Sequence, residues 1–314
     1  RAILLALMVL FIAGNALTAL ATHPLMMTAA RFIAGLPHGA YFGVAAIVAD
    51  KLVEKAFSVL AVSIVIAGAT FANLGGVPCS TLLAHLLSWR MAYALVAGTG
   101  VIVIVCVLIF VPKLPGLRPT GFLEQFRFLG RAQPWIIFLA ITLGNGGMFC
   151  WYSYVSPFLT DVSGLNPGKM TLVMAFAGAG MVLGNTLSGK LSVRFSPAAI
   201  AAGMQGVLAA SLLALFLTGE SLTAALFFLF LCTACLFGVS APQQMLLLQN
   251  ARGGEMLGSA MAQVGFNIGN ALGAFFGGLS INAGFGYAGT ACLGAAGAAA
   301  GFLLLLIYAR REKR

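Results

Sequence analysis

The chain is a series of long apolar stretches separated by short polar linkers. Each stretch has about 20 residues, enough for a helix to cross the roughly 30 Å hydrocarbon core of a bilayer. Apolar residues run continuously within each stretch instead of alternating, which favours helices over a barrel. We predict ten spans, at residues 2–21, 27–49, 57–84, 92–111, 134–158, 169–189, 198–218, 222–250, 257–280 and 287–309.

Composition agrees with this pattern. The 314 residues are 61% hydrophobic and 8% charged, whereas about 25% of the residues of a soluble domain are charged. The sequence therefore predicts an all-α polytopic membrane protein. Its net charge of +10 is spread over short loops and indicates membrane topology, with no nucleic-acid partner.

Basic residues concentrate on alternate linkers and at both ends of the chain. By the positive-inside rule these linkers and both termini are cytoplasmic. The residues placed on this side are Arg1, Lys51, Lys55, Lys113, Arg118, Arg127, Arg131, Lys190, Arg194, Arg252, Arg310, Arg311, Lys313 and Arg314.

The longest polar linker divides the spans unequally. Residues 112–133 separate four spans in 1–111 from six spans in 134–314. This linker mixes aromatic and charged residues, which suggests a short amphipathic helix at the membrane interface; an ordinary loop is the alternative.

Arg31 is the most informative polar residue, because a buried arginine costs roughly 2.5–3.5 kcal/mol on insertion scales. All seven acidic residues lie in linkers, at span edges or in the tail, so we expect Arg31 to have no intramembrane partner. The acidic residues are Asp50, Glu54, Glu124, Asp161, Glu220, Glu255 and Glu312.

Other polar side chains inside the spans are candidates for substrate binding or coupling. With Arg31 they are His38, Tyr41, Asn145, Trp151, Tyr152, Gln243 and Gln244. A packing role is the alternative for the histidine, and an aromatic belt at the membrane edge is the alternative for Trp151 and Tyr152. The adjacent glutamines point about 100° apart on a helix, so we expect one to face a cavity and the other a neighbouring helix.

Two glycine-rich segments lie six spans apart, the offset expected of a duplicated six-helix unit. The later one is a ladder with four-residue spacing, which allows helix backbones to approach closely. It indicates either static packing or a moving gate, and Asn267 and Asn270 beside it could form hydrogen bonds across helices. The gating or packing positions are Gly35, Gly68, Asn73, Gly75, Gly76, Pro78, Gly265, Gly269, Gly273 and Gly277.

The six cysteines lie in apolar stretches and predict no disulfide framework. Cys232 and Cys235 have CxxC spacing, but within a lipid-embedded helix we interpret them as small packing residues. We predict no metal, no cofactor and no catalytic residue.

Several segments resemble the major facilitator superfamily, in its drug:proton antiporter branch, and are similar to bacterial arabinose-efflux permeases. They are residues 31–48, 72–78, 88–90, 180–189 and 240–250. The resemblance implies that Arg31 and Gly35 belong to a fourth-helix motif linked to proton transfer. It also implies that the cytoplasmic loop with Gly189, Lys190 and Arg194 steers conformational switching.

Departures from the family are visible as well. Pro78 follows the glycine pair of its segment, whereas in the antiporter motif the proline precedes it. Family members have twelve helices, so the resemblance implies a major facilitator fold lacking the first two, and with them the acidic partner of Arg31.

The resulting expectation is a secondary transporter, not an enzyme, in the bacterial inner membrane. It would act as a monomer that exports sugars or other small hydrophilic compounds in exchange for protons, by alternating access. The alternative is a truncated, non-transporting remnant or a membrane binding scaffold.

Overall fold

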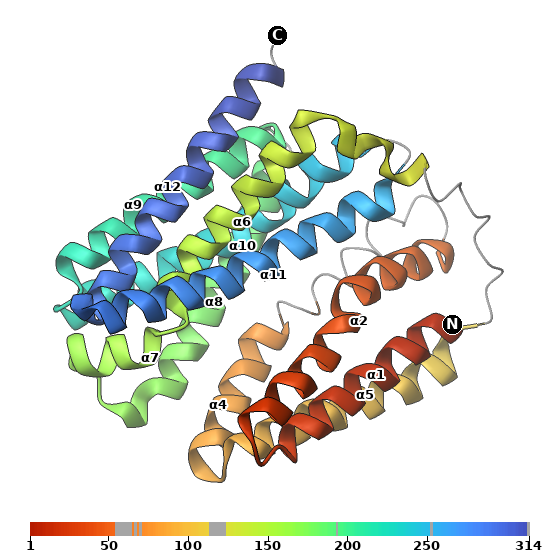
Figure 1. Ribbon diagram of the computed structural model, residues 1–314, viewed down its shortest axis with the longest axis horizontal. Helices are drawn as coiled ribbons and strands as arrows, with labels where there is room; N and C mark the ends of the chain where they lie inside the picture. The colour runs from red at the N-terminus through yellow and green to blue at the C-terminus, as the bar shows by residue number, and fades with distance from the viewer. Residues whose placement is uncertain are drawn as a thin grey trace. The chain divides into compact units, whose positions relative to one another are not determined.

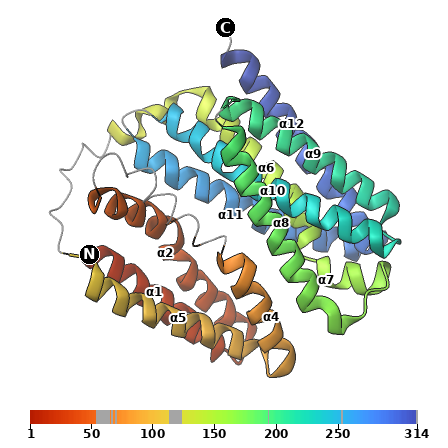
Figure 2. The same cartoon turned by 180° about the vertical axis from the view of Figure 1, so that it is seen from behind.

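The computed structural model describes residues 1–53, 65, 68, 71–112, 124–192, 194–251 and 254–312. The chain forms two compact units, Arg1–Pro119 and Thr120–Arg314, which are described separately below. Figures 1 and 2 show both units from opposite sides, as bundles of long helices.

In the first unit, α1 packs against both α2 and α5. A Cβ atom on Gly14 would lie 2.5 Å from the Cα of Ala34, so α1 and α2 cross with their backbones in contact. Pro24 begins α2, and the side chain of His23 caps it by accepting a hydrogen bond from the Leu25 amide at 3.3 Å. The elements are α1 (Ala2–Ala19), α2 (Pro24–Lys51), the π-helical turn η2 (Ala72–Gly76), α4 (Val77–Leu86) and α5 (Trp89–Phe110).

In the second unit, α6 packs against α11 and α12, while α10 packs against α8 and α9. The helix α9 also contacts α12, which closes the bundle. The elements are α6 (Ala132–Tyr152), α7 (Val155–Pro157), η4 (Phe158–Val162), η5 (Pro167–Lys169), α8 (Met170–Leu191), α9 (Pro197–Thr218), α10 (Leu222–Asn250), α11 (Glu255–Ser280), η6 (Ile281–Phe285) and α12 (Gly286–Glu312).

The membrane spans can be compared with the predicted ones. Among the described residues, seven helical stretches are long and apolar enough to cross a membrane, and the last, Ala260–Arg311, includes both α11 and α12. The helix α2 is also long enough, at 28 residues. Much of the predicted third span, 57–84, lies outside the described residues. The all-helical, multi-pass prediction is confirmed.

The linker between the units is described from residue 124 onward. Its η3 segment, Glu124–Gly130, is a short 3-10 helix. Phe128 in this segment is buried, and the indole Nε1 of Trp135 donates to the carbonyl oxygen of Leu129 at 2.8 Å. This part of the linker therefore packs onto the beginning of α6.

Candidate functional site

Arg31 lies where α1, α2 and α5 meet. Its guanidinium Nη1 donates to Oδ1 of Asn15 at 3.2 Å, and its central carbon lies 5.1 Å from the ring centroid of Tyr93. Asn15 is buried, and its Nδ2 donates to the carbonyl oxygen of Phe11 at 2.8 Å. This second bond turns Oδ1 of Asn15 toward Arg31, so the guanidinium is held by an oriented amide dipole and an aromatic face.

The expectation that Arg31 has no intramembrane partner is therefore wrong. The expectation was based on carboxylates, but the partners are neutral groups that fix the guanidinium without cancelling its charge. Sequence reasoning missed both Asn15 and Tyr93. Asn15 was detectable, because it is a strongly polar residue inside an apolar span.

A second arginine lies at the same end of this unit. Arg90, at the start of α5, donates from Nη2 to the carbonyl oxygen of Ala21 at 2.9 Å and lies 4.3 Å from the ring of Trp89. Arg31 is seven residues into α2, or about 10 Å along the helix from Pro24. One end of the first unit thus carries two arginines, each held by uncharged groups.

The other candidates on α2 have different surroundings. His38 is exposed and makes an edge-on contact with Phe42, with ring centroids 5.4 Å apart. Tyr41 is half-buried and packs against a small core cluster that includes Leu4. A Cβ atom on Gly35 would meet nothing within 4 Å, so this glycine is not required for packing inside the unit.

Asn145 forms a polar link inside the second unit. Its Nδ2 donates to the carbonyl oxygen of Phe266 at 3.0 Å and also to Oδ1 of Asn270. The prediction that an asparagine beside the glycine ladder bonds across helices is confirmed for Asn270, whereas Asn267 is exposed. Arg31 and Asn145 belong to different units, so each is considered in its own surroundings.

The glycine ladder of α11 faces α6. A Cβ atom on Gly269 would lie 2.6 Å from the carbonyl oxygen of Thr142, and one on Gly277 would lie 2.7 Å from the ring of Tyr154. Gly273 makes a similarly close approach to the backbone of α6, and Gly265 meets Ile141 and Phe138. The ladder therefore lies against a helix of its own unit.

The opposite face of α6 is equally close to α12. A Cβ atom on Gly301 would lie 2.9 Å from the carbonyl oxygen of Ala140, and one on Gly297 would lie 3.2 Å from the Cα of Gly147. Glycines on both flanks of α6 thus allow its backbone to approach two helices at once.

Trp151 and Tyr152 follow at the end of α6. Trp151 is fully buried and makes an edge-on contact with Phe158, with centroids 5.6 Å apart. A belt residue faces lipid, so the aromatic-belt alternative is wrong for Trp151. Tyr152 is half-buried and contacts Phe149, with ring centroids 5.8 Å apart.

The adjacent glutamines of α10 differ as expected for neighbours on a helix. Gln243 is 1% exposed, and among the described residues its Nε2 has no hydrogen-bond partner. Gln244 is half-buried and does have an interaction partner. Gln243 is therefore a buried amide with a free donor.

The remaining candidates lie in two short segments. Gly75 and Gly76 belong to the π-helical turn η2, and Pro78 is the second residue of α4, the helix that follows. Gly68 is exposed, and the side chain of Asn73 is outside the described part.

In the second segment, Lys190 lies in the last turn of α8 and Arg194 lies just beyond the end of that helix; both are exposed. The Ser192 hydroxyl donates to the carbonyl oxygen of Gly189 at 2.7 Å. Residue 193, between the end of α8 and Arg194, is not described.

Sequence comparisons identify relatives over most of the chain. The family model described as Major Facilitator Superfamily matches residues 1–262. The chain is 42% identical to the putative transporter AraJ of Escherichia coli K12, covering 99% of the chain and 79% of that protein. It is 35% identical to the inner membrane transport protein YdhP of the same strain (99% and 80% covered) and 28% identical to a probable sugar efflux transporter of Helicobacter pylori G27 (97% and 77% covered).

Solved structures show the same fold. The E. coli fucose:proton symporter FucP superposes with a TM-score of 0.71 at 16% identity, covering 98% of this chain and 83% of the symporter. A bacterial homologue of the human lysosomal transporter Spinster has a TM-score of 0.64 at 18% identity, with 98% and 81% covered. The fold is all-helical, the family model matches residues 1–262, and the relatives are up to 42% identical. The chain therefore belongs to the Major Facilitator Superfamily, a family of secondary transporters and not of enzymes.

Proposed function

We propose that this protein is a proton-coupled exporter of sugars or other small hydrophilic compounds that works by alternating access. Family membership supports secondary transport. The names of the Helicobacter pylori relatives, probable sugar efflux transporters, support the substrate class and the direction.

The observation that carries this proposal is the arrangement around Arg31. An exposed guanidinium has five N–H donors, and one of them is directed to Asn15. A hydrogen bond to a charged group contributes about 1.5–3 kcal/mol, and a cation–π contact adds roughly 0.5–2 kcal/mol. Together these offset much of the cost of placing Arg31 in the membrane. No residue in the described ranges accepts from the other donors, which we propose bind hydroxyl groups of a substrate.

Coupling to protons is proposed to involve His38. It lies seven residues after Arg31, which is two helical turns along the same face of α2. Histidine titrates near neutral pH, so it can gain and lose a proton during a transport cycle.

The basic residues support a specific orientation. We propose that both ends of the chain and the turn carrying Lys190 and Arg194 face the cytoplasm of a bacterial cell, because basic loops are retained on that side. The name of YdhP, an inner membrane transport protein, supports this location. The transporter is proposed to act as a monomer by alternating access, with Arg31 in the first unit and Asn145 and Gln243 or Gln244 in the second as candidate substrate or coupling residues.

Transport by reconstituted protein tests the proposal. Liposomes containing the chain are loaded with labelled sugar, a pH gradient is imposed, and efflux is followed with and without a protonophore. We expect gradient-dependent efflux that Arg31→Gln abolishes and that His38→Gln uncouples from the gradient. Efflux that is insensitive to the protonophore would contradict proton coupling, and no efflux of any sugar tested would contradict the proposed substrate class.

A further inference from the structure

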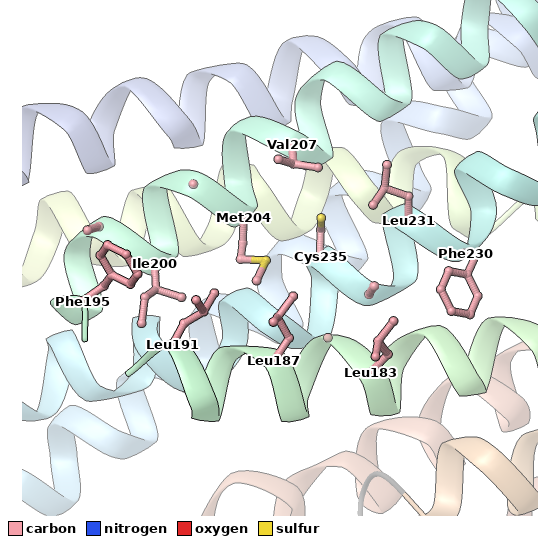
Figure 3. Close-up of a pocket in the computed structure, with 14 residues that line it drawn as sticks. Leu183, Leu187, Leu191, Phe195, Ile200, Met204, Val207, Phe230, Leu231 and Cys235 are labelled. Atoms are coloured by element: carbon pink, nitrogen blue, oxygen red, sulfur yellow. The ribbon is translucent and has the colours of Figure 1, made fainter. Parts of the chain in front are cut away.

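An apolar groove of about 480 Å³ lies between α8, α9 and α10. Figure 3 shows Leu183, Leu187 and Leu191 along α8, facing Met204 and Val207 of α9. The groove is lined by apolar side chains, glycines and Cys235. Several lining residues are open to the surroundings: Leu183 is 52% exposed and Val207 is 44% exposed.

Two basic residues are adjacent in sequence to one end of the groove. Leu191 and Phe195 line that end, and the basic residues Lys190 and Arg194 each directly precede one of them in sequence. Both basic side chains are exposed. An apolar groove on a membrane-embedded bundle, with two exposed basic residues next to its lining in sequence at one end, fits a ligand that has an anionic head and an apolar tail.

The length of the groove distinguishes between possible occupants. From Leu183 to Leu191 it follows α8 for eight residues, or about 12 Å. A transmembrane helix from a partner would need a groove through the whole core of about 30 Å, whereas an acyl chain occupies one leaflet of roughly 15 Å. The groove begins at the helix ends and stops near the middle of α8, so its length matches one leaflet.

We propose that this groove binds one acyl chain of an anionic phospholipid whose phosphate lies between Lys190 and Arg194. The apolar walls remove the chain from bulk lipid, and the two cations select a negatively charged head group over a zwitterionic one. The site lies wholly within the second unit and does not depend on the substrate or coupling ion proposed above.

Gly203 provides a way to block the groove without disturbing the bundle. It lines the groove, and a Cβ atom built on it would meet nothing within 4 Å. A leucine there would project into the open space. Gly203→Ala is the matched control, because it makes the same backbone change with far less volume.

The test is native mass spectrometry of the full chain, titrated with phosphatidylglycerol or phosphatidylcholine of identical acyl chains. We expect one tight phosphatidylglycerol site, weakened about fivefold by Lys190→Gln or Arg194→Gln, since each basic residue near the surface adds about that factor. Gly203→Leu should remove it, whereas Gly203→Ala and Lys169→Gln, at the opposite end of α8, should leave it intact.

Three results would overturn the proposal: equal affinity for both lipids, an equal loss with Lys169→Gln, or a dimer of the chain that Gly203→Leu dissociates. A photo-crosslinkable acyl chain on phosphatidylglycerol gives an independent measurement on the unaltered protein, even if a variant fails to fold. It should label residues 183–207 or 230–235, and labelling confined to helices other than α8, α9 and α10 would refute the assignment.

Discussion

Replacing Gly269 by alanine tests the close contact between α6 and α11. The added Cβ would lie 2.6 Å from the carbonyl oxygen of Thr142, whereas ordinary contact begins at 3.4 Å. That oxygen belongs to a helix backbone and cannot rotate away, so the two helices must separate by about 0.8 Å. The same shift would lengthen the bond from Asn145 to the carbonyl oxygen of Phe266, now 3.0 Å, to about 3.8 Å, which breaks it.

The magnitude follows from these two effects. Overpacking costs about 1–3 kcal/mol, and the lost hydrogen bond about 1 kcal/mol. Alanine also has a better helix propensity than glycine by up to about 1 kcal/mol. Gly203→Ala gains the same helix propensity, but its added Cβ meets no atom within 4 Å. The difference in unfolding free energy between Gly269→Ala and Gly203→Ala should therefore be about 2–4 kcal/mol.

The assay is reversible unfolding in mixed micelles with an increasing mole fraction of dodecyl sulfate, followed by circular dichroism. Gly269→Ala should unfold at a lower fraction than the unaltered chain, and Gly203→Ala at an equal or higher one. Equal stability of the two variants would refute the inference that the ladder holds α6 and α11 in backbone contact.

Three further substitutions test individual side chains. Asn15→Leu removes the amide that holds Arg31 and should lower the unfolding free energy by about 1–3 kcal/mol; an unchanged unfolding midpoint would show that the pair contributes nothing. Tyr154→Phe deletes the hydrogen bond to the carbonyl oxygen of Ala274 and should lower the free energy of unfolding by about 1 kcal/mol in the same assay. A gain in stability would show that this hydrogen bond does not stabilise the fold. Gln243→Leu replaces an amide whose Nε2 has no partner among the residues that the structure describes, so it should leave stability unchanged or raise it while reducing sugar efflux. Full efflux by this last variant would remove Gln243 from the proposed substrate site.

The sequence was sufficient for those features that depend on periodicity along the chain. Continuous apolar runs identified the helices because backbone hydrogen bonds must be satisfied internally in lipid. The four-residue spacing identified the glycine ladder, because residues spaced about one helical turn apart lie on the same face of a helix. Arg31 was conspicuous because a charge inside an apolar span is costly.

What the sequence could not predict was the choice of partners. Spacing along α11 does not reveal that Gly269 lies against Thr142, because that contact joins segments more than a hundred residues apart. Tyr93 and Asn15 contact Arg31 because separate helices pack together, and the local sequence around each residue does not indicate which helices will pack. The sequence left both a cavity role and an interfacial aromatic belt open for Trp151, because sequence position gives depth in the membrane but not the direction of the side chain.

The glycine contacts on both sides of α6 have a mechanical consequence. Helices that touch through side chains can slide as those side chains change rotamer, but α6 meets α11 and α12 through its backbone. Relative movement of these helices would drive main-chain atoms into one another. We therefore expect α6, α11 and α12 to move together as one rigid group. Any bending within this unit then falls to α8, α9 and α10, and Pro242 inside α10 marks a place where the helical hydrogen bonding is already interrupted.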